Sequence, residues 1–419
     1  MRNQRITLFF TAILLLGVLI SCASTHNSDM DMSDPRREDL KMLYATLEEN
    51  HPDLYHHQAK QAFVTFYETA LQNAPEMSDV EFYFTLSTFV ALVGDSHTMV
   101  GLPQDLVSSL HALPLQIAFV DDAWRLSVVE RNQSSLLGAE VLSLNGIPMQ
   151  QILDQAKPLV GYDNEVWLRQ SIAQQLNITE LYAYLGIVND PLAPFTVTIA
   201  QRTGQDTFSF TVTPVSIGEF YQKEYATIYD TPSQTGSARG YYRGELLGNQ
   251  GEVLFIQYNA CVSDPSYSID QFTEEILEAV SQKRFSQVIV DLRYNGGGNS
   301  RLFEPMIDGL GSLQKEQQFK LDVLIGERTF SSALMNAMQF KERTDARLVG
   351  TPTGGSVNHF GEVKTFTLPN SGIPVQYSTK RFVMDKNHEG GALQPDVLIT
   401  PTVGDLLAGV DTTVQAILL

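Results

Sequence analysis

The sequence contains little cysteine, few basic residues and no long apolar run outside its N-terminus. Cys22 and Cys261 are the two cysteines in 419 residues, so a disulfide framework cannot be the source of stability. Lys and Arg number 28 against 48 Asp and Glu, and the net charge of −20 argues against nucleic acid and anionic membrane surfaces as partners. HExxH, paired CxxC and Walker-type motifs are also absent, so no metal or other cofactor is expected.

The N-terminus has the pattern of an export signal. Basic residues precede an apolar stretch over 6–20 that is too short to span a bilayer comfortably, and Cys22 follows a small residue. This arrangement resembles a bacterial lipobox, which implies a lipid on Cys22 that anchors the exported chain to a cell membrane, facing the periplasm or the exterior. An ordinary secretory signal with an incidental cysteine is the alternative. We therefore expect a signal peptide over 1–22 and a flexible tether over 23–37.

Changes in apolar periodicity divide the rest of the chain into three regions. Helical spacing over 39–93 indicates an N-terminal helical region, which we assign to 38–110. Short apolar runs separated by turn residues predict a β-rich region over 111–220, where LLGAEVLSLNGIPMQQIL resembles the core of a PDZ domain. PDZ grooves bind chain ends by strand addition. The polar stretch over 221–248 is expected to be a linker or ordered loop at the start of a last region, 221–419.

The last region contains a strand, a glycine loop, a second strand and a helix in succession. VIVDL at 288–292 is a continuous apolar run typical of a buried parallel strand, and Asn295 then opens a run of three glycines, where the backbone can turn and expose N–H groups. After a second strand at 321–325, Ser331 and Ser332 open a predicted helix. A serine at a helix start is commonly an N-cap. Beside a glycine loop it can also be a nucleophile next to backbone donors, as acyl transfer requires.

Several motifs in this region resemble those of the S41 peptidases, the family of the C-terminal processing (tail-specific) proteases and the tricorn protease. DLRYNGGG resembles the DLRxNxGG element, TFSSALMNA and LVGTPTGG resemble the nucleophile helix and the strand-turn behind it, and GGALQPDV resembles the C-terminal segment. The resemblance covers roughly 251–419. It implies an α/β fold, a mixed sheet flanked by helices as in ClpP and crotonase. It also implies a serine endopeptidase that hydrolyses unfolded or C-terminal polypeptide segments through an acyl-enzyme.

The resemblance assigns the nucleophile and the groups beside it. Ser332 matches the catalytic serine because the family pattern places alanine directly after it. The N–H of Ala333, with that of Gly297 or Gly298, would form the oxyanion hole, and the sequence leaves open which glycine donates. Ser331 would then be a capping or packing residue.

The family uses two kinds of base. The processing proteases carry a lysine in the turn after the nucleophile helix. The turn over 353–356 of this chain lacks it, and Lys364 is the nearest substitute. The tricorn-like members use a histidine and a glutamate. GDSHT resembles their GDxHT element and FGE their FGE element, which implies His97 as general base and acid and Glu362 as the residue that orients it.

Two other hypotheses remain open. Gly94-Asp95-Ser96 looks like the GDS block of SGNH-type esterases, with Ser96 and His388 as the catalytic pair. The missing lysine also allows a catalytically inactive, peptide-binding lipoprotein of the same fold. Separate replacement of Ser96 and Ser332 by alanine distinguishes the two enzymes, and labelling with a serine-directed phosphonate distinguishes an enzyme from a binding protein.

Overall fold

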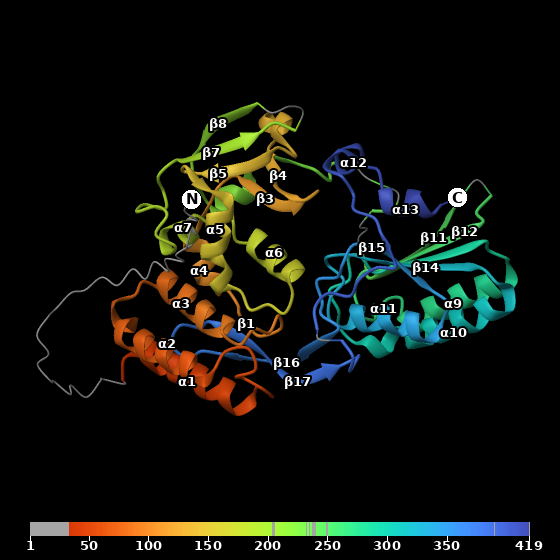
Figure 1. The fold of residues 1–419 in the computed structure, drawn as a ribbon, viewed down its shortest axis with the longest axis horizontal. Coiled ribbons are helices and arrows are strands. Elements are labelled where there is room, and N and C mark those ends of the chain that lie inside the picture. The colour runs from red at the N-terminus through yellow and green to blue at the C-terminus, as the bar shows by residue number, and fades with distance from the viewer. Residues whose placement is uncertain are drawn as a thin grey trace, which may run out of the picture.

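A computed structural model describes residues 33–202, 206–231, 233, 235–236, 240–248, 250–388 and 390–418. The predicted signal peptide, Cys22 and most of the predicted tether lie outside these residues. Within them, no helix has both the length and the apolar character needed to cross a membrane. The described chain has mixed α/β structure, with three regions packed around the segments that carry the predicted site (Figure 1).

The first region consists of helices packed on a hairpin that comes from the far end of the sequence. Asp34 caps the first helix by accepting the N–H groups of Arg36 and Arg37. A capping box between Ser78 and Glu81 starts the third. The elements are α1 (Pro35–Asn50), α2 (Lys60–Asn73), η1 (Ala74–Glu76), α3 (Asp79–Ala91), β1 (Met99–Val100), β16 (Asn358–Thr367) and β17 (Pro374–Val383).

The hairpin of β16 and β17 belongs to this region through its contacts. β1 pairs with β17 in an antiparallel register. Val375 and Tyr377 pack in the same apolar core as the buried leucines of α1 and the aromatic residues of α3. Asp39 of α1 accepts the N–H groups of Asn370 and Ser371 at the hairpin turn. A segment within the predicted region 221–419 therefore folds against the N-terminal helices.

The second region is a β-sheet with short helices around it. The strand order in the sheet is β10-β4-β5-β7-β8, and β3 and β6 also pair with β4 and β5, respectively. Asn145 and Gly146, both with positive φ, form the tight turn between β5 and β6. The elements are α4 (Gln104–Ser109), β2 (His111–Ala112), β3 (Leu115–Val120), β4 (Ala123–Glu130), η2 (Arg131–Leu136), β5 (Glu140–Leu144), β6 (Ile147–Pro148), α5 (Met149–Ala156), η3 (Lys157–Leu159), α6 (Glu165–Ala173), α7 (Thr179–Tyr184), β7 (Phe195–Ala200), β8 (Thr207–Val212), β9 (Val215–Ser216), α8 (Ile217–Gln222) and β10 (Tyr225–Thr227).

The third region is a six-stranded sheet with helices on both faces, in the order β11-β12-β13-β14-β15-β18. β12, β13, β14, β15 and β18 run parallel, and β11 is antiparallel at one edge. Helices α9, α10 and α11 cover one face, and α13 packs on the other (Figure 1). The elements are β11 (Tyr242–Leu247), β12 (Val253–Tyr258), α9 (Ile269–Gln282), β13 (Gln287–Asp291), η4 (Ser300–Phe303), α10 (Glu304–Gln317), β14 (Lys320–Ile325), α11 (Ser332–Arg343), β15 (Arg347–Gly350), β18 (Val397–Leu398), α12 (Val403–Ala408) and α13 (Thr412–Ile417).

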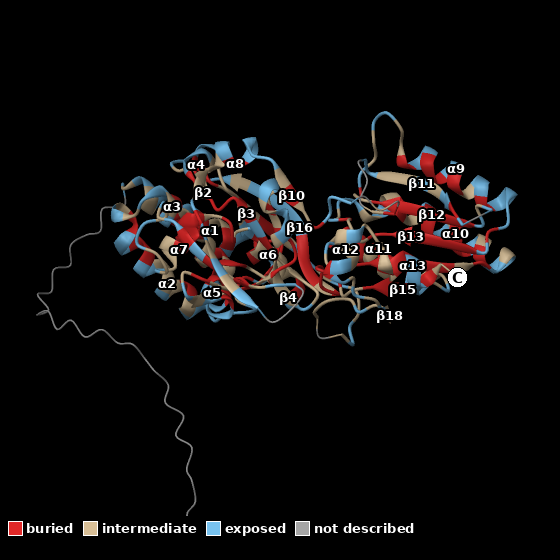
Figure 2. Cartoon of the chain, turned by 90° about the horizontal axis from the view of Figure 1, so that it is seen from above, coloured by how far each residue is buried: buried red, intermediate tan, exposed pale blue. Residues whose placement is uncertain are grey.

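The central strands of this sheet are buried on both faces, as Figure 2 shows. This burial is why the apolar run at 288–292 is continuous rather than alternating. The stretch over 221–248, predicted as a linker or loop, instead contributes β10 to the second region and β11 to the third. The second region therefore extends past the predicted boundary at residue 220 to include β10, whereas β11 lies in the third region as predicted.

Candidate active site

Asn295 holds the glycine loop beside the segment that leads to α11. Its side chain is fully buried, and its Nδ2 donates to the carbonyl of Tyr258 at 3.0 Å. Its Oδ1 accepts the N–H of Gly297 at 2.9 Å, and its own carbonyl accepts the N–H of Phe330 at 3.1 Å. One asparagine therefore joins the ends of β12, β13 and β14, which meet at the carboxyl edge of the sheet.

Gly298 is the point of closest approach in this loop. A Cβ there would lie 2.3 Å from the carbonyl oxygen of Cys261, and its φ of +131° disfavours any other residue. Cys261 donates its N–H to Gly297 at 2.9 Å and accepts that of Asn299 at 2.8 Å, so the N–H and C=O of Gly298 point away from Cys261. Burial raises the pKa of the Cys261 thiol to about 11, so this cysteine is no thiolate nucleophile at neutral pH.

Ser332 begins α11 directly beside this loop. Its hydroxyl donates to the carbonyl of Gly298 at 2.7 Å, and the residue is 7% exposed. The preceding residue, Ser331, has φ +52° and ψ −123°, a conformation that costs a non-glycine residue about 1–3 kcal/mol. Ser331 makes no capping hydrogen bond, so its predicted role as a cap is wrong. The strained turn presents the Ser332 side chain to the glycine loop instead.

Two of the three predicted oxyanion donors are engaged in other hydrogen bonds. The N–H of Ala333 donates to the carbonyl of Phe330 at 3.0 Å, and that of Gly297 donates to Asn295. The N–H of Gly298 donates to none of the described residues, and the same holds for that of Ser332, at the head of the helix. The geometry therefore favours Gly298 among the two glycines.

His97, in the loop after α3, reaches the segment over 326–332, which ends at the predicted nucleophile Ser332 and is called the nucleophile segment below. Its ring stacks nearly parallel on that of Phe330, with ring centroids 4.4 Å apart, and on that of His359, at 5.5 Å. Burial lowers the pKa of His97 to about 4, helped by His359 and opposed by Asp95. Its Nε2 is buried without a partner among the described residues, and no hydrogen bond joins His97 to Ser332. The imidazole is therefore neutral at neutral pH, and it packs on Phe330, the residue that precedes the Ser331–Ser332 turn.

Asp95 fixes the loop that carries His97. Its Oδ2 accepts Thr98 Oγ1 at 2.5 Å, Ser378 Oγ at 2.6 Å and His51 Nε2 at 3.4 Å, and its Oδ1 accepts the backbone N–H of His97 at 2.9 Å. Burial by itself would raise the pKa of Asp95, but the hydrogen bonds and the neighbouring imidazoles lower it to about 2. Asp95 is therefore an ionised anchor that ties the loop to β17.

The structure does not bring Glu362 into contact with His97. Glu362 lies in β16 with φ +55°, opposite Thr379, and the hairpin register continues unchanged from the pair Gly361–Lys380 to the pair Val363–Ser378. Its side chain is exposed and makes no hydrogen bond or ion pair with any described residue. The carboxylate faces solvent, so the orienting role of Glu362 remains a prediction without a supporting contact.

Ser96 and His388, the alternative catalytic pair, belong to separate hydrogen-bond sets. Ser96 is 1% exposed and donates to Asp163, whereas His388 accepts the N–H of Gly390 at 3.2 Å. Lys364, the substitute base, has an exposed side chain on β16. No contact among the described residues links any of these side chains to Ser332.

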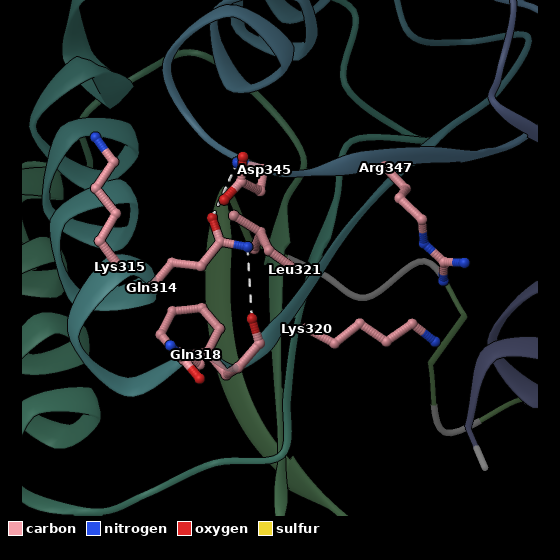
Figure 3. A pocket seen from close by; sticks show the side chains of 8 residues that line it. Gln314, Lys315, Gln318, Lys320, Leu321, Asp345 and Arg347 are labelled. Atoms are coloured by element: carbon pink, nitrogen blue, oxygen red, sulfur yellow. Dashed lines mark hydrogen bonds between the residues drawn. The ribbon is translucent and has the colours of Figure 1, made fainter.

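An open pocket at the other end of the sheet is not part of this site. It has a volume of about 560 Å³ and lies where β14 and β15 begin, at the edge opposite the nucleophile. Figure 3 shows Lys320 and Arg347 at its rim, and Arg347 already pairs with the buried Asp322 at 2.6 Å. No group of three or more His, Cys, Asp or Glu within the described ranges could hold a metal ion.

Comparison with known proteins extends the fold assignment. No family model and no curated protein matches the sequence. Among solved structures, mature CPAF in complex with lactacystin has a TM-score of 0.63 at 15% identity, covering 90% of this chain and 95% of that one. Mature CPAF alone has a TM-score of 0.61 at 15% identity, covering 90% and 94%. The chain therefore has the fold of the S41-type peptidases, as the motifs predict.

Proposed function

We propose that this chain is an exported, lipid-anchored serine endopeptidase that cleaves unfolded or C-terminal polypeptide segments. The observation that carries the proposal is the position of the Ser332 hydroxyl, 2.7 Å from the glycine loop at the strained head of a helix. The N–H of Gly298 beside it, which donates to no residue in the described part of the chain, supplies a donor for a developing oxyanion. Anchoring through Cys22 rests on the sequence pattern alone.

The reaction begins when Ser332 exchanges the Gly298 carbonyl for the imidazole of His97. The neutral His97 takes the hydroxyl proton through Nε2 while Oγ attacks the scissile carbonyl carbon, and the carbonyl oxygen becomes an oxyanion at the N–H of Gly298. The C–N bond then breaks and His97 gives its proton to the departing amine. Water, deprotonated by His97, hydrolyses the acyl-enzyme and restores Ser332.

Labelling with a serine-directed phosphonate tests this function. The wild-type protein should be modified at Ser332, as located by mass spectrometry, and Ser332→Ala should remove the label. His97→Ala should slow labelling by about 10²-fold or more, because general-base assistance is lost. A digest of an unstructured peptide library, with Ser332→Ala as control, then defines the cleavage preference. A wild-type protein that is neither labelled nor able to cleave the library would support the peptide-binding alternative, and a label on Ser96 would support the esterase.

A further inference from the structure

The two ring nitrogens of His97 have different surroundings. Nε2 is buried and has no partner among the described residues. Nδ1 lies 3.4 Å from the hydroxyl of Ser96 and 3.9 Å from Oδ1 of Asp95. If Nε2 is the atom that takes the proton from Ser332, it must be unprotonated, so the single proton of the neutral ring must be on Nδ1. The group that accepts this Nδ1–H therefore decides whether the imidazole is ready to act.

Ser96 is placed to be that acceptor. Its hydroxyl proton is committed, because Oγ donates to Oδ2 of Asp163 at 3.0 Å. A serine hydroxyl has one proton and two lone pairs, so a committed proton leaves the lone pairs for His97. Ser96 is 1% exposed, which leaves no room for bulk water to take either role.

Asp163 is itself fixed against the nucleophile segment. Its Oδ1 accepts the hydroxyl of Ser356 at 2.9 Å. The neighbouring Asn164 donates from Nδ2 to Ser356 Oγ and to the carbonyl of Gly354, each at 2.8 Å. Gly355 of the same turn donates its N–H to Thr329, in the segment that leads to Ser332. The carboxylate is therefore held from the side of the nucleophile, although it precedes α6 in the β-rich region.

Asp95 does not compete for the role. Both of its oxygens already accept stronger hydrogen bonds from the loop and from β17, and 3.9 Å exceeds a hydrogen-bond distance to Nδ1. Burial raises the pKa of Asp163 to about 6, against the hydrogen bonds from Ser356 and Ser96, so Asp163 is ionised at neutral pH and is a full acceptor for Ser96.

We propose that Asp163 is a positioning residue for His97, acting through the hydroxyl of Ser96, and this inference rests on the proposed peptidase function. With Asp163 in place, Ser96 accepts the Nδ1–H and Nε2 is bare. In Asp163→Asn the amide can donate to Ser96, which releases the hydroxyl proton toward Nδ1 and favours the tautomer protonated on Nε2. A purely structural role, in which Asp163 only ties α6 to the turn at 354–356, is the competing explanation.

Steady-state kinetics of Asp163→Asn, Ser96→Ala and the double variant separate the two explanations. We expect kcat to fall at least about tenfold in each single variant with KM within about threefold, short of the ~10⁴-fold that a directly bonded carboxylate contributes in a serine protease. The double variant should be no slower than the slower single variant, because both changes break one chain. Ser356→Ala is the matched control: it removes the other hydroxyl from the same carboxylate and should cost less than about threefold in kcat.

A second measurement reads the tautomer without turnover. In Ser332→Ala protein with ¹⁵N-labelled histidine, the His97 signal, assigned by its loss in His97→Gln, should show a proton on Nδ1. Adding Asp163→Asn should move the proton to Nε2 or mix the two forms. Retention of the Nδ1–H form in both Asp163→Asn and Ser96→Ala, or equal kinetic losses in Asp163→Asn and Ser356→Ala, would overturn the inference. A wild type without turnover would refute the proposed function alone, because the tautomer measurement would still decide the role of Asp163.

Discussion

Acidification should inactivate the protein in two steps, neither of them at the ordinary pKa of histidine. The ring of His97 stacks on those of Phe330 and His359, and burial lowers the pKa of His97 to about 4. At pH 5 an imidazole of pKa about 6.5 would be only ~3% neutral, whereas His97 would be ~90% neutral. The part of the labelling rate that depends on neutral His97 should therefore exceed that of an ordinary histidine by roughly 30-fold at pH 5, apart from the loss that protonation of Asp163 causes.

The upper step belongs to Asp163. Its pKa of about 6 results from burial and from the nearby charge of Asp95, against hydrogen bonds from Ser356 and Ser96. Protonation of Asp163 weakens its hold on Ser96, so labelling should fall partly near pH 6 and completely near pH 4. Asp163→Asn should lose the upper step and keep the lower one. Because the two groups belong to one network, the measured values are those of the coupled set.

Stability must be followed at each pH, since unfolding would imitate protonation. His97 has a folded pKa below its unfolded value, so stability falls by up to about 3 kcal/mol as the pH drops from ~6.5 to ~4. Asp163 has a folded pKa above its unfolded value, so it adds about 3 kcal/mol as the pH drops from ~6 to ~4. The opposing contributions should leave the urea midpoint nearly unchanged over this window. A single inactivation step near pH 6.5, with the urea midpoint constant, would refute the reasoning.

Two further predictions concern the glycine loop and its support. Asp411 accepts two hydrogen bonds, at 2.7 and 2.8 Å, from the largely buried guanidinium of Arg293, which a second carboxylate also contacts. Asp411→Asn removes one of these two charges and should lower the free energy of unfolding by about 2–3 kcal/mol. The control Asp405→Asn, in an exposed helix cap, should cost at most about 1 kcal/mol in the same urea titration. In Gly298→Ala the new Cβ would clash with the Cys261 carbonyl oxygen. The substitution should lower the free energy of unfolding by about 1–3 kcal/mol and slow the labelling of Ser332. The control is Gly296→Ala, where a Cβ would have no neighbour within 4 Å, so neither stability nor labelling should change. Equal effects of the two substitutions would contradict the close approach of Gly298 to Cys261.

The elements nearest the nucleophile could be predicted from the sequence because their signals are local. The apolar run of β13, the glycines after it and the serines that open α11 each lie within a few residues of the structure they produce. β10 and β11 have no such signal. Both lie in a polar stretch and are strands because β4 and β12 offer them a partner edge. The hairpin of β16 and β17 is likewise placed by its contacts with α1, far away in sequence.

The same distinction explains which site residues the sequence could indicate. Ser332 and the pair Gly297 and Gly298 are indicated by motifs in which neighbours in sequence are neighbours in space, and the structure then distinguishes the two glycines. Glu362 was assigned by a motif too, but its backbone has a positive φ and its side chain is exposed, which the motif does not reveal. Asp163 lies in no motif, and its proximity to Ser96 exists only after two regions pack together. Functional residues of this kind can be identified only from a structure and not from sequence motifs.

The site is therefore assembled by docking rather than contained in the peptidase-like sheet. Helix α6 of the β-rich region lies on the nucleophile segment itself: Trp167 stacks on Phe330 with ring centroids 4.2 Å apart, and Gln170 donates to Glu327 at 3.2 Å. Phe330 contacts His97 on its other side. A shift of α6 would thus move Asp163, the support of Phe330 and the packing of His97 together. Because Asp163 and Trp167 lie on the same short segment, we expect that the β-rich region cannot move away from Phe330 without also disturbing the surroundings of His97, the predicted base.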